Sequence, residues 1–77
     1  MKIKVLLFAG LREKMGQGEM VLDLIKGSRV SDLKKSLELE ETFWKSLAFA
    51  VNQTYSPESS LLQEGDEVAL IPPVAGG

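Results

Sequence analysis

The stretch Glu67-Val68-Ala69-Leu70-Ile71-Pro72-Pro73-Val74-Ala75-Gly76-Gly77 decides the fold, because it leads a strand into a segment that cannot continue it. Residues 67–71 alternate as a β-strand does. The two prolines have a fixed φ and no backbone N–H, so the sheet must end there and the chain must stay extended. The two glycines have no side chains, so the terminal carboxylate can enter a slot that is too narrow for a Cβ. The pattern indicates a tail built for insertion into another protein, although terminal glycines also occur by chance and chain ends are commonly disordered.

Composition sets the class of protein. The chain has 77 residues, of which 44% are hydrophobic and 26% charged, and this predicts a single domain over residues 1-77 with a modest core. No apolar run has the length of a membrane span, and Met1 leads into a strand-like alternation without a signal-peptide pattern. We therefore expect a cytoplasmic protein with no membrane partner.

The absent residue types exclude several functions. The sequence has no Cys and no His, so it lacks a thiol nucleophile, the commonest general base and the commonest metal ligand. Its 9 basic residues are scattered and outnumbered by 11 acidic ones, which argues against a nucleic-acid partner. We expect no metal site and no self-sufficient enzyme.

The first half of the chain reads as two strands and a helix. Strands are expected at residues 2–8 and 19–25, joined as a hairpin, and in the second strand Val21 and either Leu24 or Ile25 should reach the core. A single main helix is predicted from about Val30 to Glu38, because apolar residues recur there at i, i+3 and i+7.

The start of that helix and the second half are less regular. Ser28 or Ser31 can cap the helix, and the sequence does not decide between them. Residues 40–46 suggest a short helical turn whose Trp44 packs over the end of the core. A strand is expected at residues 47–51, with Phe49 inward and Ala50 outward, followed by a turn and a short return strand.

This order of elements predicts an α+β architecture of the β-grasp kind. In it, a mixed sheet carries one main helix across one face, and the first and last strands lie side by side. The C-terminal tail, residues 72–77, is expected to project from the end of the sheet as a flexible, reactive segment.

Strand parity also predicts where a partner docks. Phe8 and Ile71 lie off the core face on the two strands expected to be neighbours, and Tyr55 follows the turn nearby. Ala48 and Ala50 keep the same side flat. Scattered exposed apolar residues are normal, but several large ones converging on one face indicate a docking patch.

Three segments and the opening of the chain resemble one known family. The segments are Ala50-Val51-Asn52-Gln53, Gly65-Asp66-Glu67-Val68-Ala69 and Pro72-Pro73-Val74-Ala75-Gly76-Gly77, and the opening runs from Val5 to Phe8, then Ala9 and Arg12-Glu13. They resemble the small, sulfur-carrying subunit of molybdopterin synthase. The resemblance covers nearly the whole chain, whereas Glu38 to Ser46 matches nothing distinctive.

The resemblance implies a ubiquitin-like fold used for sulfur chemistry. In that family an ATP-dependent activating enzyme adenylates the terminal glycine, and a sulfur donor converts it to a thiocarboxylate. The tail then enters the large synthase subunit, within an expected heterotetramer, and gives sulfur to a cyclic pyranopterin precursor of the molybdenum cofactor. The face of the sheet that bears the predicted docking patch is the one that meets both partners.

Carried over to this chain, the resemblance assigns roles to the tail. Gly77 would be the modified residue, bearing a transient AMP adduct and then a thiocarboxylate. Val74, Ala75 and Gly76 would be the thread, and Pro72-Pro73 the stiff spacer. The protein would bind no permanent cofactor and would be non-catalytic alone, acting as the sulfur-donating subunit of a sulfurtransferase.

Three alternatives remain open from the sequence. The thiamine-pathway sulfur carrier shares the fold and the diglycine end. A ubiquitin-like modifier would undergo the same adenylation and then couple Gly77 to lysines of other proteins. A passive interaction domain with a frayed tail would keep its function without Gly76 and Gly77.

Overall fold

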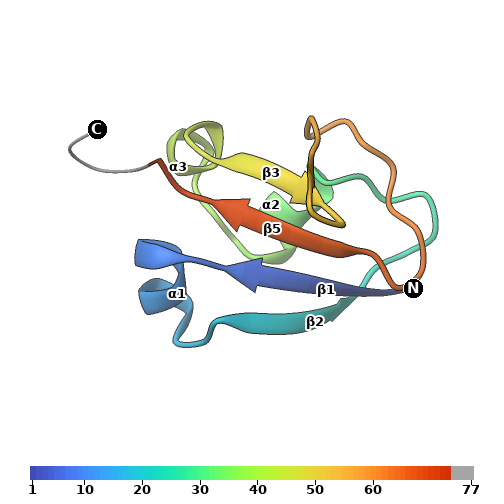
Figure 1. Cartoon of the computed structure of the whole chain (residues 1–77), viewed down its shortest axis with the longest axis horizontal. Coiled ribbons are helices and arrows are strands. Elements are labelled where there is room, and N and C mark those ends of the chain that lie inside the picture. Colours follow the sequence, from blue (N-terminus) through green and yellow to red (C-terminus); the bar gives the residue numbers. More distant parts are fainter. Residues whose placement is uncertain (74–77) are drawn as a thin grey trace.

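The computed structural model describes residues 1–73, which build a five-stranded mixed sheet in the order β2-β1-β5-β3-β4 (Figure 1). The elements in chain order are β1 (Lys2–Leu7), α1 (Ala9–Met15), β2 (Glu19–Asp23), α2 (Asp32–Ser36), α3 (Glu41–Lys45), β3 (Ala48–Val51), β4 (Thr54–Tyr55) and β5 (Glu67–Ile71). β1 and β5 pair in parallel, and the other neighbours are antiparallel. The predicted neighbourhood of the first and last strands is thus confirmed. The tail residues Val74 to Gly77 lie outside the described part.

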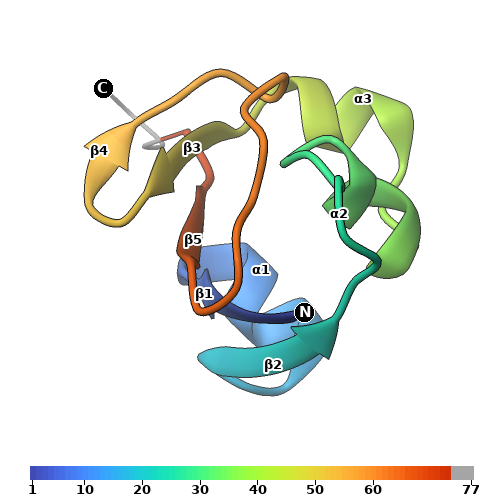
Figure 2. The same ribbon diagram turned by 90° about the vertical axis from the view of Figure 1, so that its right-hand side faces the viewer.

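The sheet curves around the helices, and the core lies between the sheet and the helices (Figure 2). The alternation in β1 and β5 places one side of each strand inward: Ile3, Val5, Val68 and Leu70 are fully buried. Trp44 on α3 is 2% exposed, and its ring centroid lies 4.7 Å from that of Phe49. The packing role predicted for the tryptophan is confirmed.

The predicted inward residues of the second strand are wrong for Val21, and of the two alternatives Leu24 is confirmed and Ile25 is wrong. Val21 is 63% exposed and Ile25 is 83% exposed, whereas Met20, Leu22 and Leu24 pack against the core. The cause is the register, which sets Leu22 opposite the buried Ile3 and Met20 opposite Val5. Because side chains alternate along a strand, a shift of one residue exchanges its two faces.

The predicted main helix is shorter than expected. Its apolar stripe is buried as predicted, but α2 ends at Ser36, and Glu38 has a left-handed φ of 54°. The N–H of Leu39 donates to the carbonyl of Lys34 at 3.0 Å, and that of Glu38 donates to Lys35 at 3.1 Å, which is a Schellman stop. A separate helix, α3, follows. Within residues 1–73, every helix lacks the length and apolar character needed to traverse a bilayer.

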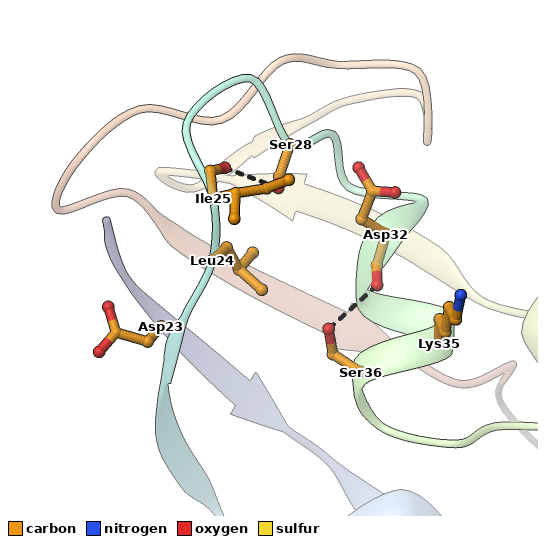
Figure 3. A pocket seen from close by; sticks show the side chains of 7 residues that line it. All are labelled: Asp23, Leu24, Ile25, Ser28, Asp32, Lys35 and Ser36. Carbon is orange, nitrogen blue, oxygen red and sulfur yellow. Dashed lines mark hydrogen bonds between the residues drawn. The ribbon is translucent and has the colours of Figure 1, made fainter.

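Neither predicted serine caps α2 through its side chain. Ser31 occupies the N-cap position without such a bond, and the Ser28 hydroxyl donates to the carbonyl of Ile25 (Figure 3). The carboxylate of Asp32 instead accepts the backbone N–H of Arg29 at 2.7 Å. A hollow of about 390 Å³ lies beside these residues. The serine hydroxyls that line it form their hydrogen bonds within the loop and the helix.

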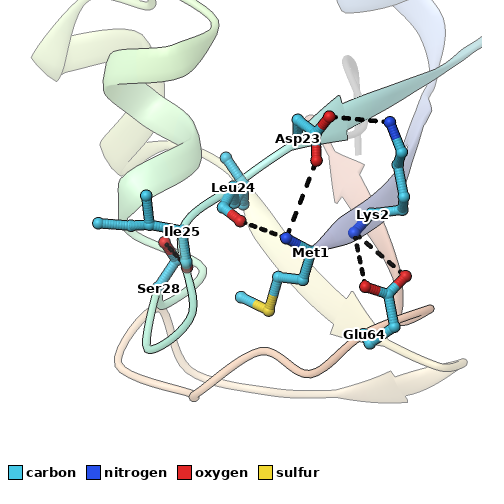
Figure 4. A network of polar contacts seen from close by, with 7 residues as sticks. All are labelled: Met1, Lys2, Asp23, Leu24, Ile25, Ser28 and Glu64. Carbon is cyan, nitrogen blue, oxygen red and sulfur yellow. Dashed lines mark hydrogen bonds and ion pairs between the residues drawn. The ribbon is translucent and has the colours of Figure 1, made fainter.

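A polar network fixes the end of the sheet where β1 begins (Figure 4). Lys2 Nζ lies 2.8 Å from Asp23, and this hydrogen bond lowers the pKa of the Asp23 carboxyl. The amino group of Met1 donates to the carbonyl of Leu24, and the N–H of Lys2 donates to Glu64. β1 is thereby held to both β2 and the segment before β5.

Two of the sequence motifs meet in a clasp between the β3–β4 turn and the start of β5. Asn52 and Gln53 both have positive φ, 50° and 70°, as a two-residue hairpin turn of the primed type requires. The Asn52 amide donates to Asp66 at 3.0 Å, and its oxygen accepts the N–H of Glu67 at 3.0 Å. The carbonyl of Asp66 accepts the N–H of Lys4 at 2.9 Å. The motifs therefore tie β3, β5 and β1 together.

We expect Asn52→Ala to lower the free energy of unfolding by about 1–2 kcal/mol, because it removes two hydrogen bonds and places a Cβ residue without a polar side chain at positive φ. Asn52→Gly is the matched variant, since it keeps the backbone conformation and loses only the hydrogen bonds. Urea unfolding monitored by Trp44 fluorescence should order the stabilities as wild type, Asn52→Gly, Asn52→Ala. Equal stability of all three would show that the clasp contributes nothing.

Candidate functional site

The sheet face opposite α2 and α3, here called the outer face, carries a continuous apolar row. The registers align Leu6 on β1 with Ala69 on β5, Ala69 with Ala50 on β3, and Ala50 with Tyr55 on β4. In the next row toward the C-terminal end of β5, Ala48 lies opposite Ile71. Small residues dominate the middle of the face, so it is flat.

The outer face changes from polar to apolar along β1 and β5. Near the start of these strands, Lys4 is in register with Glu67, and Lys4 Nζ lies 3.1 Å from Glu19 and 4.0 Å from Glu67. The bond to Glu19 raises the pKa of Lys4. Toward the other end, Phe8 and Ile71 follow the paired residues Leu7 and Leu70 on neighbouring strands. The apolar end is thus the end from which the chain continues into Pro72-Pro73.

The predicted docking residues are brought together only in part. Phe8, 45% exposed, and Ile71, partly exposed, lie at the ends of adjacent strands. Tyr55, 76% exposed, lies on the outermost strand β4, separated from β5 by β3. Ala50 was expected to be exposed, but it is 8% exposed because β4 and β5 flank it. Together they form one face rather than one contact point.

Sequence reasoning did not assign Leu6 and Ala69 to the predicted docking patch. Both lie in the row that connects the ends of the face, and both are partly exposed. Their parity gave the signal, since each alternates with fully buried neighbours in its strand. Leu6 follows Lys2 and Lys4 on the same side of β1 and is partly exposed, so it marks the outer face as clearly as Phe8 does.

A second apolar feature, the tail-root hollow, adjoins this end of the outer face. Ala9 has a φ of 49°, so the chain turns out of β1 directly after Phe8 and enters α1. The hollow that results has a volume of about 760 Å³. It is lined by Phe8, Ala9, Gly10, Phe43, Ser46, Ile71, Pro72 and Pro73. The root of the tail, Pro72 and Pro73, thus lines an open hollow together with residues of α1, α3 and β5.

The described residues offer surfaces for binding and no reactive cluster. Within residues 1–73, no group of three or more metal-ligating side chains is placed to hold an ion. Pro72 and Pro73 continue directly from β5, as the sequence predicts, and the predicted thread and reactive residue, Val74 to Gly77, lie beyond the described residues. What residues 1–73 provide is a flat apolar face that ends at the root of a tail.

The fold and this face define a class. A mixed sheet with parallel first and last strands, helices on one face and the C-terminal strand leading outward is the ubiquitin-like β-grasp fold. The chain belongs to the ThiS family, whose model matches residues 5–77.

Relatives and solved structures agree with this assignment. The chain is 39% identical to the molybdopterin synthase sulfur carrier subunit of Chlamydomonas reinhardtii, over 100% of both chains. Among solved structures, it is similar to SAMP1 of Haloferax volcanii, with 26% identity, a TM-score of 0.86 and full coverage of both chains. It is also similar to a candidate molybdopterin converting factor subunit 1 of Pyrococcus furiosus, with 30% identity, a TM-score of 0.80 and 96% and 99% coverage.

The two faces of the sheet predict different costs for two matched substitutions. Phe8→Ala should change the free energy of unfolding by less than about 1 kcal/mol, because its ring lies off the core. Phe49→Ala should cost about 3–5 kcal/mol, because Phe49 is 8% exposed and packs against Trp44. Chemical denaturation measures both. A loss of stability in Phe8→Ala as large as that in Phe49→Ala would mean that Phe8 is a core residue.

Proposed function

We propose that this protein is the sulfur carrier subunit of a molybdopterin synthase and that Gly77 carries the sulfur. The observation that carries the proposal is the match over the full length of a relative bearing that name. The flat apolar face that ends at Pro72-Pro73 supports it, because a carrier must dock by its folded part while its tail reaches a distant reaction centre. ATP-dependent loading fits action in the cytoplasm.

The chemistry requires nothing from the chain beyond its terminal carboxylate. A carboxylate is a poor electrophile, and its joining to AMP, with release of pyrophosphate from ATP, supplies a leaving group. Attack by sulfide displaces AMP and leaves a thiocarboxylate on Gly77. Attack by a persulfide gives an acyl disulfide instead, and a second thiol of the partner then cleaves its sulfur–sulfur bond, forming a disulfide with the donor and releasing the thiocarboxylate. In the large subunit, that sulfur would pass to the pyranopterin precursor. ATP, metal and bases belong to the partners, which is consistent with a chain lacking Cys and His.

Energetics explain why a docking face is needed. Ordering the four tail residues after Pro73 costs about 1–2 kcal/mol of backbone freedom each, so roughly 4–8 kcal/mol opposes insertion. Val74-Ala75-Gly76-Gly77 has too little side chain to recover this by contacts. The apolar end of the outer face must therefore supply the binding energy. It would do so both in the complex with the activating enzyme and in the heterotetramer formed with the large subunit.

A ubiquitin-like modifier is the second candidate, favoured by the similarity to SAMP1, a small archaeal modifier protein. It would use the same adenylate and form an isopeptide bond between Gly77 and a lysine instead of a thiocarboxylate. Mass spectrometry of peptides from the source cells distinguishes the two, since only a modifier leaves Gly77 attached to lysines. The names of the relatives favour the molybdopterin subunit over the thiamine-pathway carrier.

The tail prediction tests the proposed function. Deleting Gly77, or adding one residue after it, should abolish sulfur loading, and Gly76→Val should block it because a β-branched side chain jams a channel shaped for glycine. Ala75→Gly is the matched control and should load normally. Transfer of labelled sulfur in a reaction with activating enzyme, ATP and donor measures the effect, with thermal unfolding as the check on the fold. Loading of the chain that lacks Gly77 would refute the carrier hypothesis.

The docking prediction concerns the outer face. Phe8→Ala should weaken binding to the activating enzyme and to the large subunit by more than about tenfold, the usual loss for a buried aromatic anchor. Val21→Ala is the control, since Val21 is exposed on the same face but opposite Lys4 at its polar end. Titration calorimetry gives both affinities. Equal losses in the two variants would contradict the assignment of the docking end.

A shared face also predicts that the two partners exclude each other. Sulfur delivery then requires release from the activating enzyme before the large subunit binds. Competition between the two partners for one labelled carrier should be complete. A ternary complex with both partners on one carrier would show that they use different surfaces, without affecting the tail chemistry.

A further inference from the structure

One wall of the tail-root hollow comes from α3 and not from the outer face. Phe43 on α3 lines the hollow together with Phe8, which follows β1, and Ile71 at the end of β5. Figure 1 shows α1 and α3 at the same end of the molecule as the C-terminal end of β5. Phe43 is half-buried, since part of it packs on the core. The hollow at the root of the tail is therefore lined by two aromatic side chains from separate parts of the chain.

Lys14 on α1 places a positive charge beside Phe43, one of the side chains that line the hollow. Its Nζ lies 5.6 Å from the centroid of the Phe43 ring, within the range of a cation–π interaction. Lys14 is exposed, and it takes no part in the ion pairs that residues 1–73 form. By contrast, Lys34 and Lys4 are paired with carboxylates. A positive charge thus lies over a side chain that lines the apolar hollow, and among residues 1–73 no carboxylate forms an ion pair with it.

We propose that the docking surface continues from the outer face, across the tail root, onto Phe43 and Lys14. The partner segment that covers it would be a protein segment presenting an apolar side chain to the hollow and a carboxylate to Lys14. This inference rests on the proposed function, because a protein that encloses the tail must approach its root. Consecutive Cα atoms are about 3.8 Å apart, so any partner that grips Val74 lies within contact of the residues around Pro73.

The same two residues fit a role in partner choice. α3 derives from the stretch between Glu38 and Ser46, which carries none of the motifs shared with the sulfur-carrier family. Apolar anchors supply affinity, whereas charges at an interface edge mainly set association rate and discriminate between partners. Phe43 would therefore strengthen the complex, and Lys14 would favour surfaces with a carboxylate at the matching position.

The test uses the full chain and its cognate large subunit, with three variants and a matched control. Lys14→Glu reverses the charge, Phe43→Leu keeps an apolar side chain on the core but removes the ring, and Phe8→Ala reports on the outer face. Lys35→Glu is the control, because Lys35 is exposed on α2 beside the hollow of Figure 3, away from the tail root. Thermal unfolding confirms that each variant is folded.

Binding kinetics at low and high salt give the outcome. Lys14→Glu should weaken binding about two- to fivefold at low salt, mostly through a slower association rate, and the difference should shrink at high salt. Phe43→Leu should weaken it about threefold or more, through faster dissociation. Lys35→Glu should bind as wild type does.

Two negative results have different meanings. If Lys14→Glu and Phe43→Leu both bind like Lys35→Glu while Phe8→Ala is weakened, the surface stops at the outer face and this inference is wrong, with the proposed function intact. If the unmodified chain binds neither the large subunit nor the activating enzyme, the proposed function fails and this inference fails with it.

Discussion

β1 and β5 run parallel as neighbours inside the sheet, with Val5 opposite Val68 and Leu7 opposite Leu70. This pairing joins the two ends of the chain, and it fixes which residues of both strands are buried. Because side chains alternate, the same register that buries Leu7 and Leu70 exposes Phe8 and Ile71 side by side. The apolar end of the outer face and the root of the tail therefore follow from one strand pairing.

The division of the sheet into two faces lets stability and the proposed binding rest on different residues. The inner face is closed by short helices that bury Leu33 and Trp44. The outer face keeps small residues in its middle and larger apolar ones toward the tail. Under the proposed function, a tail with almost no side chain can then be given over to chemistry, because the core of residues 1–73 is complete before Pro72.

Much of this could be predicted from the sequence, because the decisive signals are local. The alternation in β1 and β5 and the diproline after Ile71 identify the strands and their end without tertiary information. The side of β2 that faces the core could not be predicted in the same way. Val21 and Met20 are both apolar, and only the register with β1 decides between them. The stop of α2 at a left-handed Glu38 likewise has no glycine to announce it.

The candidate site could also be predicted only in part from the sequence. Parity was enough to place Phe8 and Ile71 on the outer face and to associate them with the tail. The placement of Lys14 over the Phe43 ring could not be read from the sequence, because it depends on how α1 and α3 approach each other in space. Long-range placement of short helices is set by packing, and the motifs of the chain carry no information on it.

The central claim is that Gly77 exists in cells as a thiocarboxylate. Its most direct test is the intact mass of the protein isolated from cells that synthesise the cofactor, followed by fragmentation to locate any change. The account predicts a fraction whose mass has increased by the exchange of one oxygen for sulfur, located at Gly77 and absent when the activating enzyme is deleted. An unmodified carboxylate in every molecule, under conditions of active cofactor synthesis, would contradict it.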